Sequence, residues 1–140
     1  MIKLLIGHKG SGKTKSMIDL ANTEIEKCDG SVIFINKDQS LMYDLKYRIR
    51  TVCMEEYAGI TDAEEYIGFI YGIISSDHDI ETIYIDSIMS HTDFKISDLP
   101  EFIERLKKIS ELYGPNFVVS INADRAEMNG VDFSGTEVIE

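Results

Sequence analysis

Four short runs of mostly apolar residues recur along the chain, at residues 2–6, 32–35, 82–85 and 117–121. Apolar and polar positions do not alternate within these runs, which is typical of strands covered on both faces in a parallel sheet. The segments between the runs have helical spacing instead. This order predicts an α/β fold, a three-layer sandwich in which helices cover both faces of a mostly parallel sheet of about five strands.

Three helices are expected between the runs. The first spans about residues 13–28 and ends before Gly30, the second opens with a capping box at residues 61–64, and the third begins near Pro100 and ends at residues 114–115. The positions expected to face the core are Met17, Ile18, Ala21, Ile25 and Cys28 in the first helix, Ala63, Tyr66, Ile67, Ile70, Ile73 and Ile74 in the second, and Phe102, Ile103, Leu106, Ile109 and Leu112 in the third.

Two segments have a less regular pattern. Residues 37–60 form a long connection in which a short strand is expected at about residues 50–53, and residues 123–140 end in a possible edge strand at residues 138–139. Because 140 residues suit one domain with one hydrophobic core, we expect a single domain over residues 1–140.

Composition narrows the range of partners and compartments. Hydrophobic residues make up 44% of the chain and charged residues 28%, as in folded globular proteins, but the net charge is -11. Nucleic acid is therefore an unexpected partner, because such binding needs clustered Lys and Arg. The apolar stretch at residues 1–7 is too short for a signal peptide or a membrane span, and Cys28 and Cys53 have no CxxC partner. These features predict a cytoplasmic protein with free thiols, no structural zinc site and no membrane partner.

The first apolar run leads directly into GHKGSGKT, residues 7–14, which matches the Walker A pattern G-x-x-x-x-G-K-[ST]. The motif stands between a predicted strand and a predicted helix, which is the context that it requires. Its glycines can adopt backbone angles closed to other residues, so that loop N–H groups surround phosphate oxygens at a helix N-terminus that favours anions. The predicted nucleotide-binding residues are Gly7, His8, Lys9, Gly10, Ser11, Gly12, Lys13, Thr14 and Lys15.

Lys13 and Asp86 are the predicted catalytic residues. We expect Lys13 to place its ammonium against the β and γ phosphates. Asp86 directly follows the run at residues 82–85, although on that pattern alone it could equally be a helix cap or a turn residue. After a Walker A motif, it is interpreted as a Walker B aspartate. Mg²⁺ is the expected cofactor, with Thr14 and Asp86 as the metal-site residues and Asp86 acting through a bound water, because Mg²⁺ favours oxygen ligands and keeps part of its hydration shell.

GHKGSGKT and IYIDS together resemble the motifs of the P-loop NTPase superfamily. The apolar run between the motifs and the run after them are similar to the branch that contains RecA-type ATPases and thymidine kinases. The whole chain resembles small stand-alone bacterial P-loop proteins of unknown function. The resemblance implies a P-loop NTPase fold and a strand at residues 117–121 that lies between the two motif strands. It also implies a polar sensor of the γ phosphate at Ser120 or Asn122, although a plain turn residue is the alternative for Asn122.

The expected function is that of an ATP-binding protein, since no N-K-x-D guanine motif is present. Many ATPases of this branch have a glutamate directly after the Walker B aspartate, where this chain has Ser87. We therefore expect a Mg²⁺-dependent ATPase that is slow or is stimulated by an unidentified protein partner, with Glu55, Glu56 and His91 as candidate bases. Two alternatives stay open: a kinase of a small, nucleoside-like molecule, and a module that binds nucleotide without hydrolysing it.

Further candidates have structural alternatives of equal or greater weight. They are Arg48, Arg50 and Arg125 for an arginine that stabilises the transition state, and Tyr43, Tyr47 and Tyr57 for stacking on the base. Surface ion pairing is the alternative for the arginines, and packing in the core or at an edge is the alternative for the tyrosines.

Overall fold

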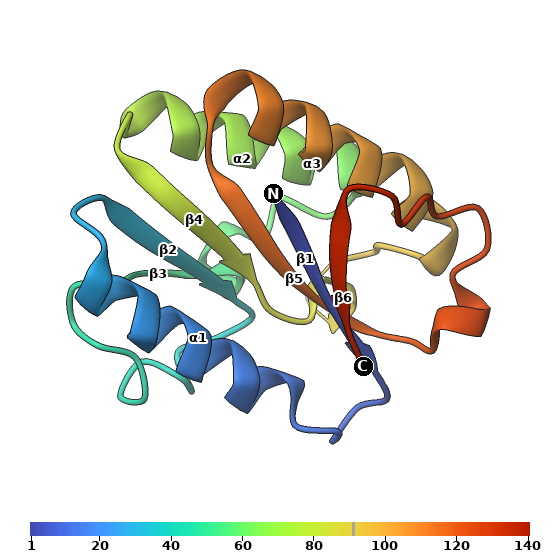
Figure 1. The fold of residues 1–140 in the computed structure, drawn as a ribbon, viewed down its shortest axis with the longest axis horizontal. Helices are drawn as coiled ribbons and strands as arrows, with labels where there is room; N and C mark the ends of the chain where they lie inside the picture. Colours follow the sequence, from blue (N-terminus) through green and yellow to red (C-terminus); the bar gives the residue numbers. More distant parts are fainter. Residues whose placement is uncertain (91) are drawn as a thin grey trace.

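Six parallel strands form one sheet in the computed structural model, which describes residues 1–90 and 92–140 (Figure 1). The strands are β1 (Ile2–Gly7), β2 (Ser31–Asn36), β3 (Arg50–Cys53), β4 (Ile80–Ile85), β5 (Asn116–Asn122) and β6 (Thr136–Ile139). The α-helices among the described residues are α1 (Lys13–Lys27), α2 (Ala63–Ser76) and α3 (Leu99–Tyr113). Short 3-10 helices are η1 (Met54–Tyr57), η2 (Ile88–Ser90), η3 (Ile96–Asp98) and η4 (Arg125–Glu127). The predicted α/β class is confirmed.

The strand order is β3-β2-β4-β5-β1-β6, and every pair of neighbouring strands is parallel. The sheet has one strand more than the predicted five, because both irregular segments supply an edge strand, β3 at one side and β6 at the other. β5 separates β1 from β4, as the family resemblance implied. Since all strands run in the same direction, their carboxyl ends lie along one edge of the sheet.

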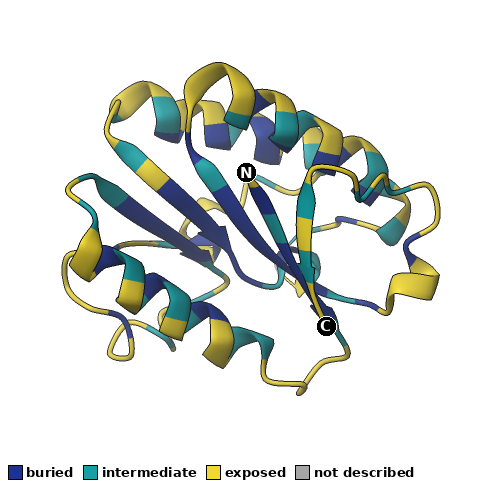
Figure 2. Ribbon diagram, viewed as in Figure 1, coloured by how far each residue is buried: buried dark blue, intermediate teal, exposed yellow. Residues whose placement is uncertain are grey.

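Helices cover both faces of the sheet and give the predicted three layers (Figure 1). On one face α1 buries Met17, Ala21 and Ile25 against alternate residues of the central strands. On the other face α2 and α3 pack on the larger apolar cluster. The central strands are buried almost throughout, whereas the outward sides of the helices are exposed (Figure 2). Burial on both faces explains why these strands lack polar alternation.

The start of α2 differs from the predicted capping box by one residue. The N-cap is Asp62 rather than Thr61, and the Asp62 side chain accepts a 2.8 Å hydrogen bond from the backbone N–H of Glu65. The Glu65 carboxylate in turn accepts from the N–H groups of Thr61 and Asp62 at 3.1 and 3.2 Å. Asp62 has the extended backbone of an N-cap and a carboxylate that reaches the third helical residue, so the pair Asp62 and Glu65 replaces Thr61 and Glu64.

The predicted ends of α3 are confirmed, but its apolar stripe is one residue too long. Pro100 stands in the first turn, and Gly114 ends the helix with φ 97°. Leu112 is 70% exposed, against the prediction that it faces the core. Three residues of an α-helix fall about 60° short of a full turn, so the three successive steps from Ile103 to Leu112 accumulate about 180° and turn Leu112 out of the buried face. Ile18 and Cys28 of the first predicted stripe are only half-buried.

Both cysteines are free, as predicted, with Cys28 half-buried and Cys53 buried. Burial raises the pKa of both thiols, which favours their neutral form. Among the described residues, no helix combines the length and the apolar character that crossing a membrane requires.

Candidate functional site

The loop between β1 and α1 depends on glycine at two positions. Gly10 has φ 87° and Gly12 has φ 90°, in the left-handed region that residues with a Cβ rarely adopt. Gly12 is also the N-cap of α1, and no side chain caps this helix end. The first N–H groups of an α-helix have no partner within the helix, and the helix dipole adds partial positive charge there. The loop thus presents backbone donors to an anion at the carboxyl edge of the sheet.

Lys13 is held across this loop. Its ammonium donates hydrogen bonds to the carbonyl oxygens of Gly7 and His8, each at 2.8 Å, and lies 3.3 Å from the hydroxyl of Ser11. Burial lowers the pKa of Lys13 from its ordinary value, and the charge of Asp86 partly opposes that shift. The loop therefore holds the positive charge where it interacts with the carboxylate that follows β4.

Asp86 is a buried carboxylate just beyond the end of β4, with 4% of its surface exposed. It accepts a 2.8 Å hydrogen bond from the hydroxyl of Ser120, and the Thr14 hydroxyl lies 3.2 and 3.1 Å from its two oxygens. The backbone N–H of Asp86 donates to Ile35 of β2 at 2.9 Å. Residues of β5 and α1 thus hold this side chain and β2 holds its main chain, and residues 72 positions apart in the sequence meet at the predicted metal site.

The parallel register of β4 and β5 explains the contact between Asp86 and Ser120. Ile85 pairs with Val119, so the next residue of each strand reaches the same point of the sheet edge. The Ser120 hydroxyl also accepts a 2.7 Å hydrogen bond from the backbone N–H of Ser87, a residue with φ 52°. One buried hydroxyl therefore fixes both the carboxylate and the turn that follows it.

The oxygen donors at this point fit Mg²⁺. A buried carboxylate and a hydroxyl are ligand types that Mg²⁺ prefers. The Thr14 hydroxyl lies within hydrogen-bond distance of both Asp86 oxygens, at 3.1 and 3.2 Å, so the two predicted metal-site residues are adjacent.

A cavity of about 480 Å³ connects these groups along the carboxyl edge of the sheet. The predicted residues that line it are Lys9, Gly10, Gly12, Lys13, Thr14, Asp86 and Asn122. The predicted residues outside its lining are Gly7, His8, Ser11, Lys15 and Ser120. His8 and Lys15 are exposed, whereas Ser120 is buried and reaches the site only through Asp86. Between the two candidate sensors, Asn122 therefore faces the cavity and Ser120 supports the carboxylate.

Sequence reasoning missed the contribution of the segment after β2. Further lining residues are Asn36 at the end of β2, Lys37, Asp38 and Ser40 after it, and Ser87 and Ser90 from the segment after β4. The sequence did offer a signal for these residues, because they stand at the end of a predicted strand and the carboxyl ends of all strands in a parallel sheet reach the same edge. Only the position of β2 beside β4 shows that this strand is close enough to take part.

A second cavity of about 390 Å³ adjoins the first and shares Lys37 and Ser90 with it. The remaining lining residues are Met54, Glu55, Ala58, Ile60, Thr61, Thr92 and Asp93. Of the candidate bases, Glu55 thus lies in the adjoining cavity, whereas the Glu56 carboxylate accepts a 3.0 Å hydrogen bond from Gln39. His91 lies outside the described residues.

No protein-family model matches this chain, and no curated protein is significantly similar to it in sequence. The functional argument therefore depends on the residues and the geometry of the site.

The candidate arginines are engaged elsewhere. Arg50 pairs with Asp77 at 3.1 Å, Arg125 pairs with Glu140 at 2.9 Å, and Arg48 donates to the carbonyl of Ile25 at 3.0 Å. None of the three lines the 480 Å³ cavity. The candidate tyrosines do not line it either: Tyr43, Tyr47 and Tyr57 are exposed.

Proposed function

We propose that the protein has the P-loop NTPase fold and binds Mg²⁺ together with a nucleoside triphosphate. The triphosphate that we propose is ATP. One observation carries the proposal: Lys13, Thr14 and Asp86 converge on one cavity beside a glycine loop that opens a helix. The cavity volume of about 480 Å³ falls in the range of small-molecule sites, roughly 300–1,000 Å³. In a chain of net charge -11, three lysines line this cavity against two carboxylates: the lysines are Lys9, Lys13 and Lys37, and the carboxylates are those of Asp38 and Asp86.

Each residue has a stated role in the proposal. The loop amides and the N-terminus of α1 bind the phosphate oxygens, and the ammonium of Lys13 neutralises the β and γ phosphates. Thr14 and Asp86 hold Mg²⁺, which supplies charge stabilisation when bound. Ser120 is a positioning residue, because it orients the Asp86 carboxylate without lining the cavity. Asn122 lines the cavity, and its proposed role is to contact the terminal phosphate.

Hydrolysis is proposed to be slow unless a protein partner supplies a further group. Ser87 follows Asp86 and has no carboxylate to activate water, and its N–H is already bonded to Ser120. Single-turnover phosphate release with Mg²⁺ and ATP measures this step. Release that depends on Asp86 supports an ATPase, whereas tight binding without any release supports a non-hydrolysing module.

The adjoining cavity favours one alternative, phosphoryl transfer to a small molecule. Glu55 and Asp93 place two carboxylates in a space that meets the first cavity at Lys37 and Ser90. A carboxylate in that position suits a general base for a hydroxyl acceptor. Incubation with ATP and a panel of nucleosides separates the two functions, because a kinase yields a phosphorylated nucleoside and an ATPase yields free phosphate.

Calorimetric titration of Mg²⁺ and ATP tests the binding proposal. We expect Lys13→Ala to weaken affinity by at least about 30-fold, since losing one partner of a desolvated charge pair costs about 2 kcal/mol or more. Lys27→Ala removes the same charge from the exposed last turn of α1 and serves as the matched control. Equal affinity for both variants, or no binding of any common triphosphate to the wild type, would refute the proposal.

A further inference from the structure

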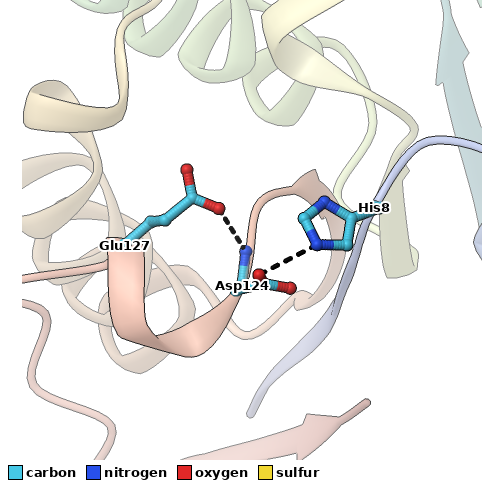
Figure 3. A group of neighbouring side chains, drawn as sticks. All are labelled: His8, Asp124 and Glu127. Atoms are coloured by element: carbon cyan, nitrogen blue, oxygen red, sulfur yellow. Dashed lines mark hydrogen bonds and ion pairs between the residues drawn. The ribbon is translucent and has the colours of Figure 1, made fainter.

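Three side chains that could ligate a metal ion meet outside the cavity, at the outer end of the glycine loop. They are His8 from the loop and Asp124 and Glu127 from the segment after β5, and their ligand atoms all lie within 4.8 Å of one another. His8 Nε2 is directed at the Asp124 carboxylate, 2.9 Å away (Figure 3). The Glu127 carboxylate turns back and accepts a 3.0 Å hydrogen bond from the backbone N–H of Asp124 (Figure 3).

The pairing of β1 with β5 brings the residues of this cluster close together. Gly7, the residue before His8, pairs with Asn122 in the register of β1 and β5 and makes a further bridge to Ala123, the residue before Asp124. The turn of η4 then brings Glu127 back to the Asp124 main chain, since the Glu127 N–H donates to the Asp124 carbonyl at 3.0 Å. The three side chains therefore extend from backbone that the sheet edge and one helical turn already position.

Arg125 does not pair with the carboxylates of this cluster. Arg125 stands between the two acids in the sequence, but its guanidinium pairs with Glu140 at 2.9 Å and lies 4.8 Å from the centre of the Phe133 ring. Two carboxylates and an imidazole nitrogen are ligand types that transition-metal dications bind.

We propose that His8, Asp124 and Glu127 form a site for one divalent transition-metal ion of the Zn²⁺ class, separate from the Mg²⁺ site at Thr14 and Asp86. Imidazole nitrogen suits Zn²⁺, Ni²⁺ and related ions, whereas Mg²⁺ favours an all-oxygen shell. Two tetrahedral ligands at 2.0–2.2 Å from Zn²⁺ are about 3.4 Å apart. The separation of His8 and Asp124 is 2.9 Å and all three ligand atoms lie within 4.8 Å of one another, so side-chain rotation would bring the three around one ion, with water as the fourth ligand.

An ion here bridges the loop after β1 to the segment after β5. The His8 carbonyl accepts hydrogen bonds from the Lys13 ammonium and from the Ser11 N–H, so the metal would hold a loop residue that also positions Lys13. The metal site itself does not require the proposed nucleotide function, and Zn²⁺ binding is measured without nucleotide.

Calorimetric titration of the whole chain with ZnCl₂ tests the proposal, in excess MgCl₂ to occupy oxygen-only sites. We expect one Zn²⁺ per chain. His8→Ala removes the nitrogen ligand and should weaken affinity by more than about 100-fold, beyond the range for losing an outer-shell partner. Glu127→Gln should weaken it by at least about 10-fold. His78→Ala, which removes an exposed histidine elsewhere, should leave Zn²⁺ affinity unchanged.

Circular dichroism of each variant without metal checks the fold, and all three substituted side chains are exposed, so we expect unchanged spectra. The proposal is overturned if the wild type binds no Zn²⁺ at millimolar concentration. It is equally overturned if binding survives His8→Ala, because the ion would then lie at the thiols or at carboxylates elsewhere.

Discussion

Ser120→Ala is the substitution that isolates the support of the buried carboxylate. The Ser120 side chain is fully buried, donates to Asp86 at 2.8 Å and accepts from the Ser87 N–H at 2.7 Å. The methyl group of alanine fits the same space, so the change removes two hydrogen bonds and little volume. Its cost therefore reports hydrogen bonding rather than a cavity.

The expected magnitude follows from the two contacts. A hydrogen bond to a charged group contributes about 1.5–3 kcal/mol, and an unpaired buried N–H costs about 1–3 kcal/mol. Because the main chain relaxes partly, we expect Ser120→Ala to lower the free energy of unfolding by about 2–4 kcal/mol. A domain with roughly 5–15 kcal/mol of stability remains folded after this loss. Mg²⁺-dependent ATP affinity should fall about 10–100-fold, as for an outer-shell partner of a metal ligand.

Urea denaturation followed by circular dichroism measures the stability change. Ser75→Ala is the control, because Ser75 is exposed and its hydroxyl bonds to Gly72 within α2, so the change should cost less than about 0.5 kcal/mol. Combining Ser120→Ala with Asp86→Asn completes a double-mutant cycle in which we expect a coupling of about 0.5–3 kcal/mol. A cost for Ser120→Ala no larger than the control, or strict additivity with Asp86→Asn, would refute the reasoning.

Two further predictions concern α2. Gly68→Ala should stabilise the protein by about 0.5–1 kcal/mol in urea titrations, because a Cβ there meets no atom within 4 Å and glycine weakens a helix interior; no gain would contradict this. Hydrogen bonds from Thr61 and Asp62 lower the pKa of Glu65, so the unfolded chain binds the proton more tightly. The Glu65 contribution is thus complete above the ordinary glutamate pKa and lost as pH falls through the folded-state pKa. Acid titration of unfolding should show a weaker loss of stability in Glu65→Gln, and identical profiles would exclude this contribution.

Local periodicity predicted most of the elements. The apolar runs became β1, β2, β4 and β5, and α1 begins at Lys13 as predicted. Each of these elements depends on the spacing of apolar and polar residues within one short segment, and that spacing can be read directly from the sequence. One error arose where two neighbouring residues could both cap a helix, as at the start of α2. The other arose where a three-residue spacing was extended along a helix whose period is 3.6 residues, as at Leu112.

The candidate site was predictable only in part, because some of its contacts join residues far apart in the sequence. The Walker A pattern makes Lys13 and Thr14 candidates, and an apolar run that ends in a carboxylate makes Asp86 a candidate only once that motif precedes it. Neither pattern predicts that Ser120 bonds to Asp86, because that contact depends on the register between β4 and β5. The adjoining cavity likewise depends on β3 lying beside β2 and on β2 lying beside β4.

By itself the sequence determined an α/β chain with a glycine loop between its first strand and first helix, since neighbouring residues encode strand, turn and helix. Only the tertiary structure decided which polar groups meet at the sheet edge, including the carboxylate with its buried hydroxyl and the group of His8, Asp124 and Glu127. The physical reason is that strand order and register are set by packing summed over the whole core. Those two quantities, and no local pattern, fix the distance between side chains far apart in the chain.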